Sequence, residues 1–292
     1  MTTKAYGSAP SMLPLYLRAA LPALPGIGSL PGIRHRSDTA PDLALTRNGV
    51  RVDPAQLRRF ERVCGFAVGD VLPATYLHLS VFSLHLALMT DTAFPLAPMG
   101  SVHVANSITV HRRLGAGEAY DMRVSASDLR PHPKGRQIDL RSTAQVAGRT
   151  VWEETTTLLA RGRSDPAVPD TPRLAGDDAP PGTTQWRLAA DLGRRYAAVS
   201  GDRNPIHLYA ATAKAFGFPR QIAHGMWTAS RCLVALQGRL PDAYTVDVAF
   251  KKPIPLPSTV GFGSRLGDGV IDLVVRRAKD GAPHVMGRVT PG

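Results

Sequence analysis

Two segments of this chain repeat nearly the same short sequence. Residues 58–65 read RRFERVCG and residues 194–201 read RRYAAVSG, with identical residues at four of the eight positions. Farther on, Ile-Asp-Leu occurs at 138–140 and again at 271–273. Matches in the same order and at nearly the same spacing indicate a duplicated unit. The fold is therefore expected to be one unit of roughly half the 292 residues, present twice.

Composition places the chain among globular proteins and argues against nucleic-acid binding. Hydrophobic residues make up 43% and charged residues 20%, which is enough for a packed core. The net charge of +12 comes from 35 Lys+Arg against 23 Asp+Glu, but no basic run exceeds two residues and RNA-binding aromatic motifs are missing. We therefore expect an anionic partner other than nucleic acid, such as a phosphate-bearing cofactor or an acidic carrier protein.

Cysteine usage and hydropathy favour a cytoplasmic protein without a membrane span. Cys64 and Cys232 cannot form a disulfide framework, and no CxxC or Cys/His cluster suggests a zinc motif. The apolar stretch 12–33 is interrupted by Arg18 and by four prolines, so it is too broken to cross a membrane. A short amphipathic arm that packs on the body is the expected structure of this stretch.

The distribution of prolines suggests that the chain has four parts. Five prolines between Ser164 and Gly182 predict a linker, because such a stretch joins neither a helix nor a central strand. The prediction is an N-terminal arm at 1–45, a first domain at 46–163, the Pro-rich linker at 164–182 and a second domain at 183–292.

Both domains carry the same series of predicted elements. Asp53-Pro54 opens a short helix in the first, and a similar helix begins near Asp191 in the second. A long apolar helix follows at Tyr76–Met89 and again at 226–237, and alternating strands come after each. A helix that is apolar on most of its surface must be enclosed. We therefore predict an α+β fold in which an antiparallel sheet curls round each long helix.

One stretch of the second domain combines groups suited to acid–base chemistry. Asp202 and His207 flank the turn at Asn204-Pro205, so a carboxylate and an imidazole can meet and exchange protons near neutral pH. Gly225 opens the buried helix, where its backbone N–H can face an oxyanion. The alternative is purely structural: a helix C-cap, an Asx turn and two capping histidines.

These residues resemble the signature of the MaoC-like, (R)-specific enoyl-thioester hydratases of the hot-dog fold. Their pattern, Tyr-x-x-x-Ser-Gly-Asp-x-Asn-Pro-x-His followed by Ile-Ala-His-Gly-Met, is matched at Tyr196, Ser200, Gly201, Asp202, Asn204, Pro205, His207, Ile222, Ala223, His224, Gly225 and Met226. The sequence departs at Tyr209, where many members have an acidic residue. The whole chain is similar to the double hot-dog dehydratases of actinobacterial fatty-acid metabolism.

The resemblance implies reversible hydration of a trans-2-enoyl thioester to an (R)-3-hydroxyacyl thioester. Asp202 and His207 would hold and activate a water, Asn204 would orient the pair, and the Gly225 amide would stabilise the thioester oxygen. It also implies substrate contacts from Ser200, Ile222, His224 and Met226. No metal or redox cofactor is expected, because a thioester already acidifies C2. Coenzyme A or a phosphopantetheine carries the acyl group. The alternatives are a hot-dog thioesterase and a non-catalytic acyl-thioester-binding subunit.

The first copy lacks the polar residues of the second. When the repeat is extended without a gap, Phe66, Val68 and Val71 stand opposite Asp202, Asn204 and His207. We therefore predict a degenerate first hot-dog domain and one active site per chain. Two such domains already supply the usual paired unit, so the chain is expected to be a monomeric pseudo-dimer or a homodimer.

Two further groups each have two interpretations. Arg220, Lys251 and Lys252 are candidates for the phosphates of coenzyme A or a carrier, against the alternative of solvated surface charge. His78 and His85, seven positions apart on one helix face, suggest a metal pair. The sequence shows no third ligand in register, which favours packing.

Overall fold

The computed structural model describes residues 1–21, 37–162, 167–168, 174 and 184–292. The chain is α+β and divides into two compact units, each assembled from separate segments. The first unit contains Met1–Arg51, Leu77–Val104 and Glu118–Pro172, and the second contains Val52–Tyr76, Ala105–Gly117 and Arg173–Gly292. Most of the predicted linker at 164–182, and residues 22–36 of the predicted arm, lie outside the described residues.

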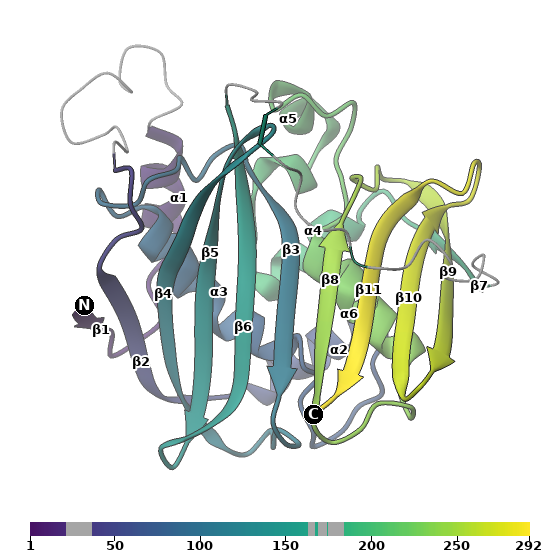
Figure 1. The fold of residues 1–292 in the computed structure, drawn as a ribbon, viewed down its shortest axis with the longest axis horizontal. Coiled ribbons are helices and arrows are strands. Elements are labelled where there is room, and N and C mark those ends of the chain that lie inside the picture. Colours follow the sequence, from purple (N-terminus) through teal and green to yellow (C-terminus); the bar gives the residue numbers. More distant parts are fainter. Residues whose placement is uncertain (22–36, 163–166, 169–173, 175–183) are drawn as a thin grey trace. The chain divides into compact units, whose positions relative to one another are not determined.

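The first unit is built on a sheet of long strands in the order β1-β2-β4-β5-β6-β3 (Figure 1). Its strands are β1 (Thr2–Ala5), β2 (Leu43–Arg51), β3 (Ser101–Val110), β4 (Ala119–His132), β5 (Gly135–Val146) and β6 (Arg149–Arg161). β1 pairs parallel with β2, whereas β2, β4, β5 and β6 pair antiparallel. The antiparallel pairing follows from the short turns between consecutive strands, such as Ala147-Gly148, where both residues adopt a positive φ.

Two helices belong to this unit. Helix α3 (Tyr76–Met89) has the bounds expected from its apolar run, and Leu77, Val81 and Leu84 are fully buried. Helix α1 (Met12–Ala20) buries Leu15 and Ala19 against Leu86 of α3, which confirms a packed arm over these residues. Within the described part of the chain, no helix has the length and apolarity that crossing a membrane requires.

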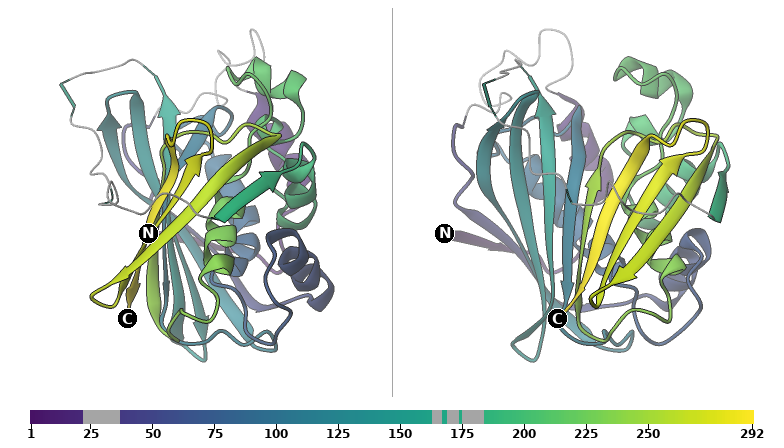
Figure 2. Two further views of the ribbon diagram at one scale, coloured as in Figure 1. Left: turned by 90° about the vertical axis from the view of Figure 1, so that its right-hand side faces the viewer. Right: turned by 45° about the vertical axis from the view of Figure 1, so that its right-hand side comes forward.

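The second unit repeats this plan. Its strand order is β8-β11-β10-β9-β7, and the second half of β3, from Ala105 to Val110, pairs antiparallel with β8. The strands are β7 (Thr184–Leu188), β8 (Tyr244–Phe250), β9 (Ser258–Gly267), β10 (Val270–Arg277) and β11 (Pro283–Pro291). Helix α6 (Gly225–Ala235) lies on one face of these strands (Figure 2). Strand for strand, this order corresponds to β3-β6-β5-β4-β2 of the first unit.

The repeated short segments form two similar helices, both in the second unit. α2 (Pro54–Cys64) and α4 (Leu192–Ser200) each end at a glycine in the left-handed conformation, Gly65 and Gly201. Only glycine adopts this conformation without strain, which accounts for its presence at the end of both copies. The rings of Phe60 and Tyr196, which occupy equivalent repeat positions, lie 6.4 Å apart between centroids. These features support the duplication inferred from the sequence.

Candidate active site

The candidate site begins where α4 ends. The N–H of Gly201 donates to the carbonyl oxygen of Ala197 at 3.0 Å, which closes the helix, and φ of +78° turns the chain away from it. The buried Ser200 hydroxyl then accepts a hydrogen bond from the N–H of Asp202 at 3.1 Å. The C-cap therefore fixes the backbone of Asp202.

Two consecutive Asx turns carry the chain from Asp202 to His207. Oδ1 of Asp202 accepts from the N–H of Asn204 at 3.1 Å, and Oδ1 of Asn204 accepts from the N–H of Ile206 at 3.3 Å. The second bond caps the short 3₁₀ helix η3 (Pro205–His207). Helix α5 (Ala210–Ala215) follows. The C-cap and the Asx turns of the structural interpretation are present, whereas His224 makes no side-chain capping bond. The same turns also bring Asp202 and His207 to one place.

His207 is buried with one ring nitrogen committed to the backbone. Its Nδ1 lies 2.8 Å from the carbonyl oxygen of Ile222, an acceptor, so Nδ1 carries the proton. Burial lowers the pKa of His207, while Asp202 and the Ile222 hydrogen bond act in the opposite direction. The ring is therefore neutral near pH 7, and its Nε2 offers a lone pair.

His224 lies flat against His207. The two ring centroids are 3.7 Å apart with an interplanar angle of 24°, and Nε2 of His224 donates to the main-chain oxygen of Asp202 at 3.0 Å. Burial, and next the neighbouring His207, lower the pKa of His224 to about 3. Its Nε2 is also 3.7 Å from Oδ2 of Asp202, a side chain that is one-quarter exposed. The uncharged His224 ring therefore positions His207 by stacking and Asp202 by its hydrogen bond to the main chain.

The segment before α6 is tied to its neighbours by backbone hydrogen bonds. The N–H of Ile222 donates to the oxygen of Ile206 at 3.0 Å, so Ile222 is joined to the η3 region through both its N–H and its carbonyl. The N–H of Ala223 donates to the carbonyl oxygen of Ile254, and the N–H of Leu256 donates to the carbonyl oxygen of Gln221. The two bonds of Ile222 bring the two halves of the sequence motif together.

Gly225 is the first residue of α6 and touches the ring of Phe250. A Cβ atom at position 225 would lie 2.9 Å from Cζ of Phe250, which leaves no room for a side chain. The N-cap residue His224 makes no side-chain hydrogen bond to the first turn. Backbone N–H groups at the positive end of this helix are thus available to an anionic oxygen.

The other predicted binding residues differ in burial. Met226 is buried, and its carbonyl accepts from the Ser230 hydroxyl at 2.7 Å. Arg220 and Lys252 are exposed and Lys251 is half-buried just after β8. Their proposed contact with phosphate stays a prediction. Tyr209, the departure from the motif, is 55% exposed, and the guanidinium of Arg194 lies over its ring.

Gly193 also contributes to the site, although the sequence motif did not single it out. A Cβ atom there would clash with the carbonyl oxygen of His207 and lie 3.1 Å from its carbonyl carbon. The repeat carried a signal for this residue, because the buried Leu57 occupies the equivalent position of the first copy. A glycine therefore replaces a core leucine only where η3 approaches the helix.

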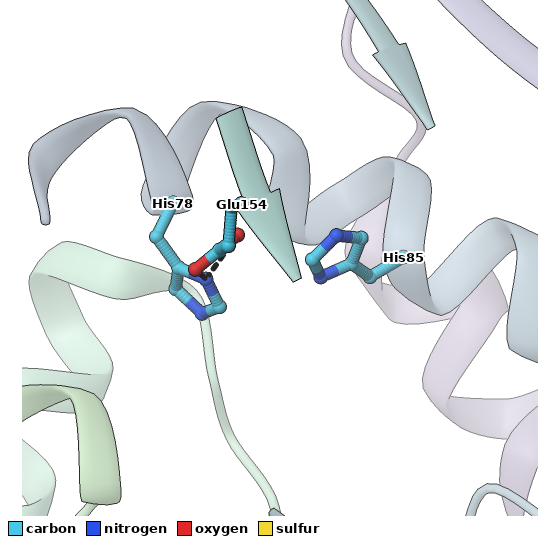
Figure 3. Close-up of side chains that lie close together, drawn as sticks. All are labelled: His78, His85 and Glu154. Atoms are coloured by element: carbon cyan, nitrogen blue, oxygen red, sulfur yellow. Dashed lines mark hydrogen bonds and ion pairs between the residues drawn. The ribbon is translucent and has the colours of Figure 1, made fainter. Parts of the chain in front are cut away.

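The structure also corrects the view that His78 and His85 have no third partner. Glu154, from β6, lies 2.8 Å from Nδ1 of His78, and the three side chains form one buried group in the first unit (Figure 3). Burial lowers the pKa of His85 to about 3. The missing ligand was the reason for favouring packing, so that reason no longer holds.

The depressed histidine pKa values predict a loss of stability in mild acid. Because His224 stays neutral in the folded state to about pH 3 but protonates near 6.5 when unfolded, the unfolded state binds more protons below pH 6.5. The free energy of unfolding should thus fall by about 1 kcal/mol per such histidine over the first pH unit below 6.5. Urea denaturation at pH 7.0 and 5.5 measures this, and the decrease should be smaller in His224→Gln. An equal decrease in that variant would contradict the assignment.

Comparisons with known proteins show which family the chain resembles. Residues 177–273 match the model of the MaoC like domain. The chain is 37% identical over 281 residues to 3-hydroxyacyl-thioester dehydratase X of Mycobacterium tuberculosis, covering 96% of this chain and 98% of that protein. It is also 27% identical over 216 residues to the enoyl-CoA hydratase ChsH3 of the same organism, covering 71% of this chain and 65% of the relative.

A solved structure shows the same relationship. The crystal structure of HtdX from M. tuberculosis superposes with a TM-score of 0.76 at 36% identity, over 85% of this chain and all of that one. The fold and the sequence match are those of a MaoC-like dehydratase. The chain belongs to the MaoC-like dehydratase family.

Proposed function

We propose that this protein adds water to trans-2-enoyl thioesters to form (R)-3-hydroxyacyl thioesters, and catalyses the reverse dehydration. The observation that carries the proposal is the neutral His207, whose Nδ1 is anchored to Ile222 so that Nε2 is left to act beside Asp202. The name of the relative that matches nearly the whole chain, 3-hydroxyacyl-thioester dehydratase X, supports the same reaction.

In this proposal Asp202 and His207 hold one water between them. As its oxygen bonds to C3 of the substrate, one proton passes to this acid–base pair and the C2=C3 double bond opens. A proton delivered to C2 completes the addition, so no net proton is consumed. Asn204 keeps the turn that carries both groups in place. No residue of this scheme needs a redox cofactor, because the thioester itself makes C2 acidic.

The Gly225 amide is proposed to stabilise the thioester oxygen as it gains negative charge. We expect Gly225→Ala to lower kcat by about tenfold or more, because the added methyl group would push against Phe250 and displace the first turn of α6. Steady-state kinetics on an enoyl thioester measures the effect. The double variant Gly225→Ala/Phe250→Ala should regain part of the lost turnover, and wild-type turnover in the single variant would refute this role.

The finer architecture is also a proposal. We infer a double hot-dog, in which the sheet of each unit wraps its long helix, α3 or α6, and the second copy carries the single active site. The corresponding strand orders and the burial of both helices support it. Arg220, Lys251 and Lys252 are proposed to contact the phosphates of coenzyme A or of an acyl carrier protein. The chain would act as a monomeric pseudo-dimer or as a homodimer.

One assay separates the candidate activities. With crotonyl-coenzyme A, a hydratase removes the enoyl absorbance without releasing free thiol, so both signals are followed together. Release of thiol would instead assign a thioesterase. Loss of neither signal, with the thioester bound, would assign a non-catalytic binding subunit.

A further inference from the structure

A second group of ionisable side chains lies in the first unit. His78 and His85 come from α3, His103 from β3 and Glu154 from β6. The rings of His78 and His85 are 5.6 Å apart between centroids, and those of His78 and His103 are 6.4 Å apart. The proposed hydration uses none of these residues.

The donor atoms of the group converge. Nδ1 of His78 lies 2.8 Å and 3.0 Å from the two carboxylate oxygens of Glu154, so both oxygens are directed at the ring (Figure 3). One ligand atom each from His78, His85 and Glu154 falls within 4.8 Å of the others. Small side-chain rotations would bring these atoms to about 2 Å from a common ion.

His85 is held in an orientation suited to binding. Its Nε2 lies 2.7 Å from the hydroxyl of Ser142, a buried residue of β5. Histidine ligands of metals commonly donate one ring N–H to such a partner, which orients the ring and leaves the other nitrogen for the ion. In this arrangement Nε2 donates to Ser142, and Nδ1 is the ligand atom.

Burial of the carboxylate would make a bound cation stabilising. Glu154 and His85 are each 2% exposed and His78 is 7% exposed, so the carboxylate has almost no access to solvent. An isolated buried carboxylate is strongly unfavourable. Protonation of His78 would balance the charge of Glu154, but it would leave His85 without an interaction with the carboxylate. A divalent ion would balance the charge and engage both rings.

We propose that His78, His85 and Glu154 bind one divalent transition-metal ion of the zinc class. Imidazole and carboxylate together form a ligand set that zinc accepts in four-coordinate geometry. Because the group is buried and the proposed hydration uses none of its residues, the role is structural. The ion would tie α3 to β6.

Zinc binding by the untagged full chain tests the proposal. After dialysis against micromolar zinc, elemental analysis should find about one ion per chain. His85→Gln and Glu154→Gln should each lower the bound zinc by about tenfold or more. The glutamine at 85 keeps an amide nitrogen for Ser142 while it removes Nδ1, and circular dichroism checks folding. Zinc should also raise Tm of the wild type and not of these variants.

The matched control addresses the other group in the described part of the chain that is close enough to hold an ion, formed by Asp202, His207 and His224. His207→Asn should retain the zinc. Loss of zinc in this control with retention in His85→Gln would overturn the proposal, as would a wild type that binds none. If His85→Gln and Glu154→Gln fail to fold, X-ray absorption of zinc-loaded His207→Asn decides, because this variant leaves the other group with one imidazole. A first shell with two imidazoles supports the site, and a shell with one or none contradicts it.

Discussion

Replacing Asp202 by asparagine should lower kcat by about 10²-fold or more, because it removes the only negative charge of the proposed acid–base pair. The substitution is nearly isosteric, and the asparagine side-chain oxygen can still accept from the N–H of Asn204. The turn should therefore survive, and stability should change little. Steady-state kinetics with crotonyl-coenzyme A measures the loss.

His207→Asn extends this first prediction to the imidazole. The side-chain nitrogen of asparagine can reproduce the Nδ1 hydrogen bond to the carbonyl of Ile222, whereas nothing replaces Nε2. A similar loss of about 10²-fold is expected. Exposed residues provide matched controls: Asp268→Asn and His111→Ala should retain wild-type turnover. Near-wild-type turnover in Asp202→Asn or His207→Asn would refute the catalytic assignment.

The second large effect is expected from Gly193→Ala. The new methyl group would occupy the position of the His207 carbonyl, so α4 and η3 must separate. A displacement of about 1 Å at a catalytic base can cost about 10²-fold in rate. We expect a loss of that order in kcat.

Helix propensity sharpens this prediction. Alanine is favoured over glycine in a helix by about 1 kcal/mol, so the substitution would stabilise α4 if space were available. Lower stability and lower kcat together would therefore report the close approach itself. Gly267→Ala is the control, since a methyl group there meets nothing within 4 Å. Unchanged kcat in Gly193→Ala would mean that the helix–turn contact does not position His207.

Elements with a strong local signal could be predicted from the sequence. Helix α3 has the predicted bounds because ten of its fourteen residues are apolar, and α2 begins at Pro54 because Asp53 caps it through Ala55. The parallel pairing of β1 with β2 had no such signal, since Thr2–Ala5 is a short strand whose partner is set by the fold.

The candidate site shows the same limit. The spacing of Asp202 and His207 around Asn204-Pro205 was enough to predict that a loop joins them. The anchor of His207 is a main-chain carbonyl, that of Ile222, and any residue type supplies one. The approach of Glu154 to His78 depends on the register of β5 and β6 and on helix packing, so no local sequence pattern predicts this contact.

The central claim is stereospecific hydration at the Asp202–His207 site, and chiral analysis of the product tests it most directly. Wild-type protein incubated with crotonyl-coenzyme A should yield (R)-3-hydroxybutyryl-coenzyme A, and Asp202→Asn should yield about 10²-fold less in the same time. An (S) product, free coenzyme A in place of the hydroxyacyl thioester, or equal yields from the two proteins would contradict the account.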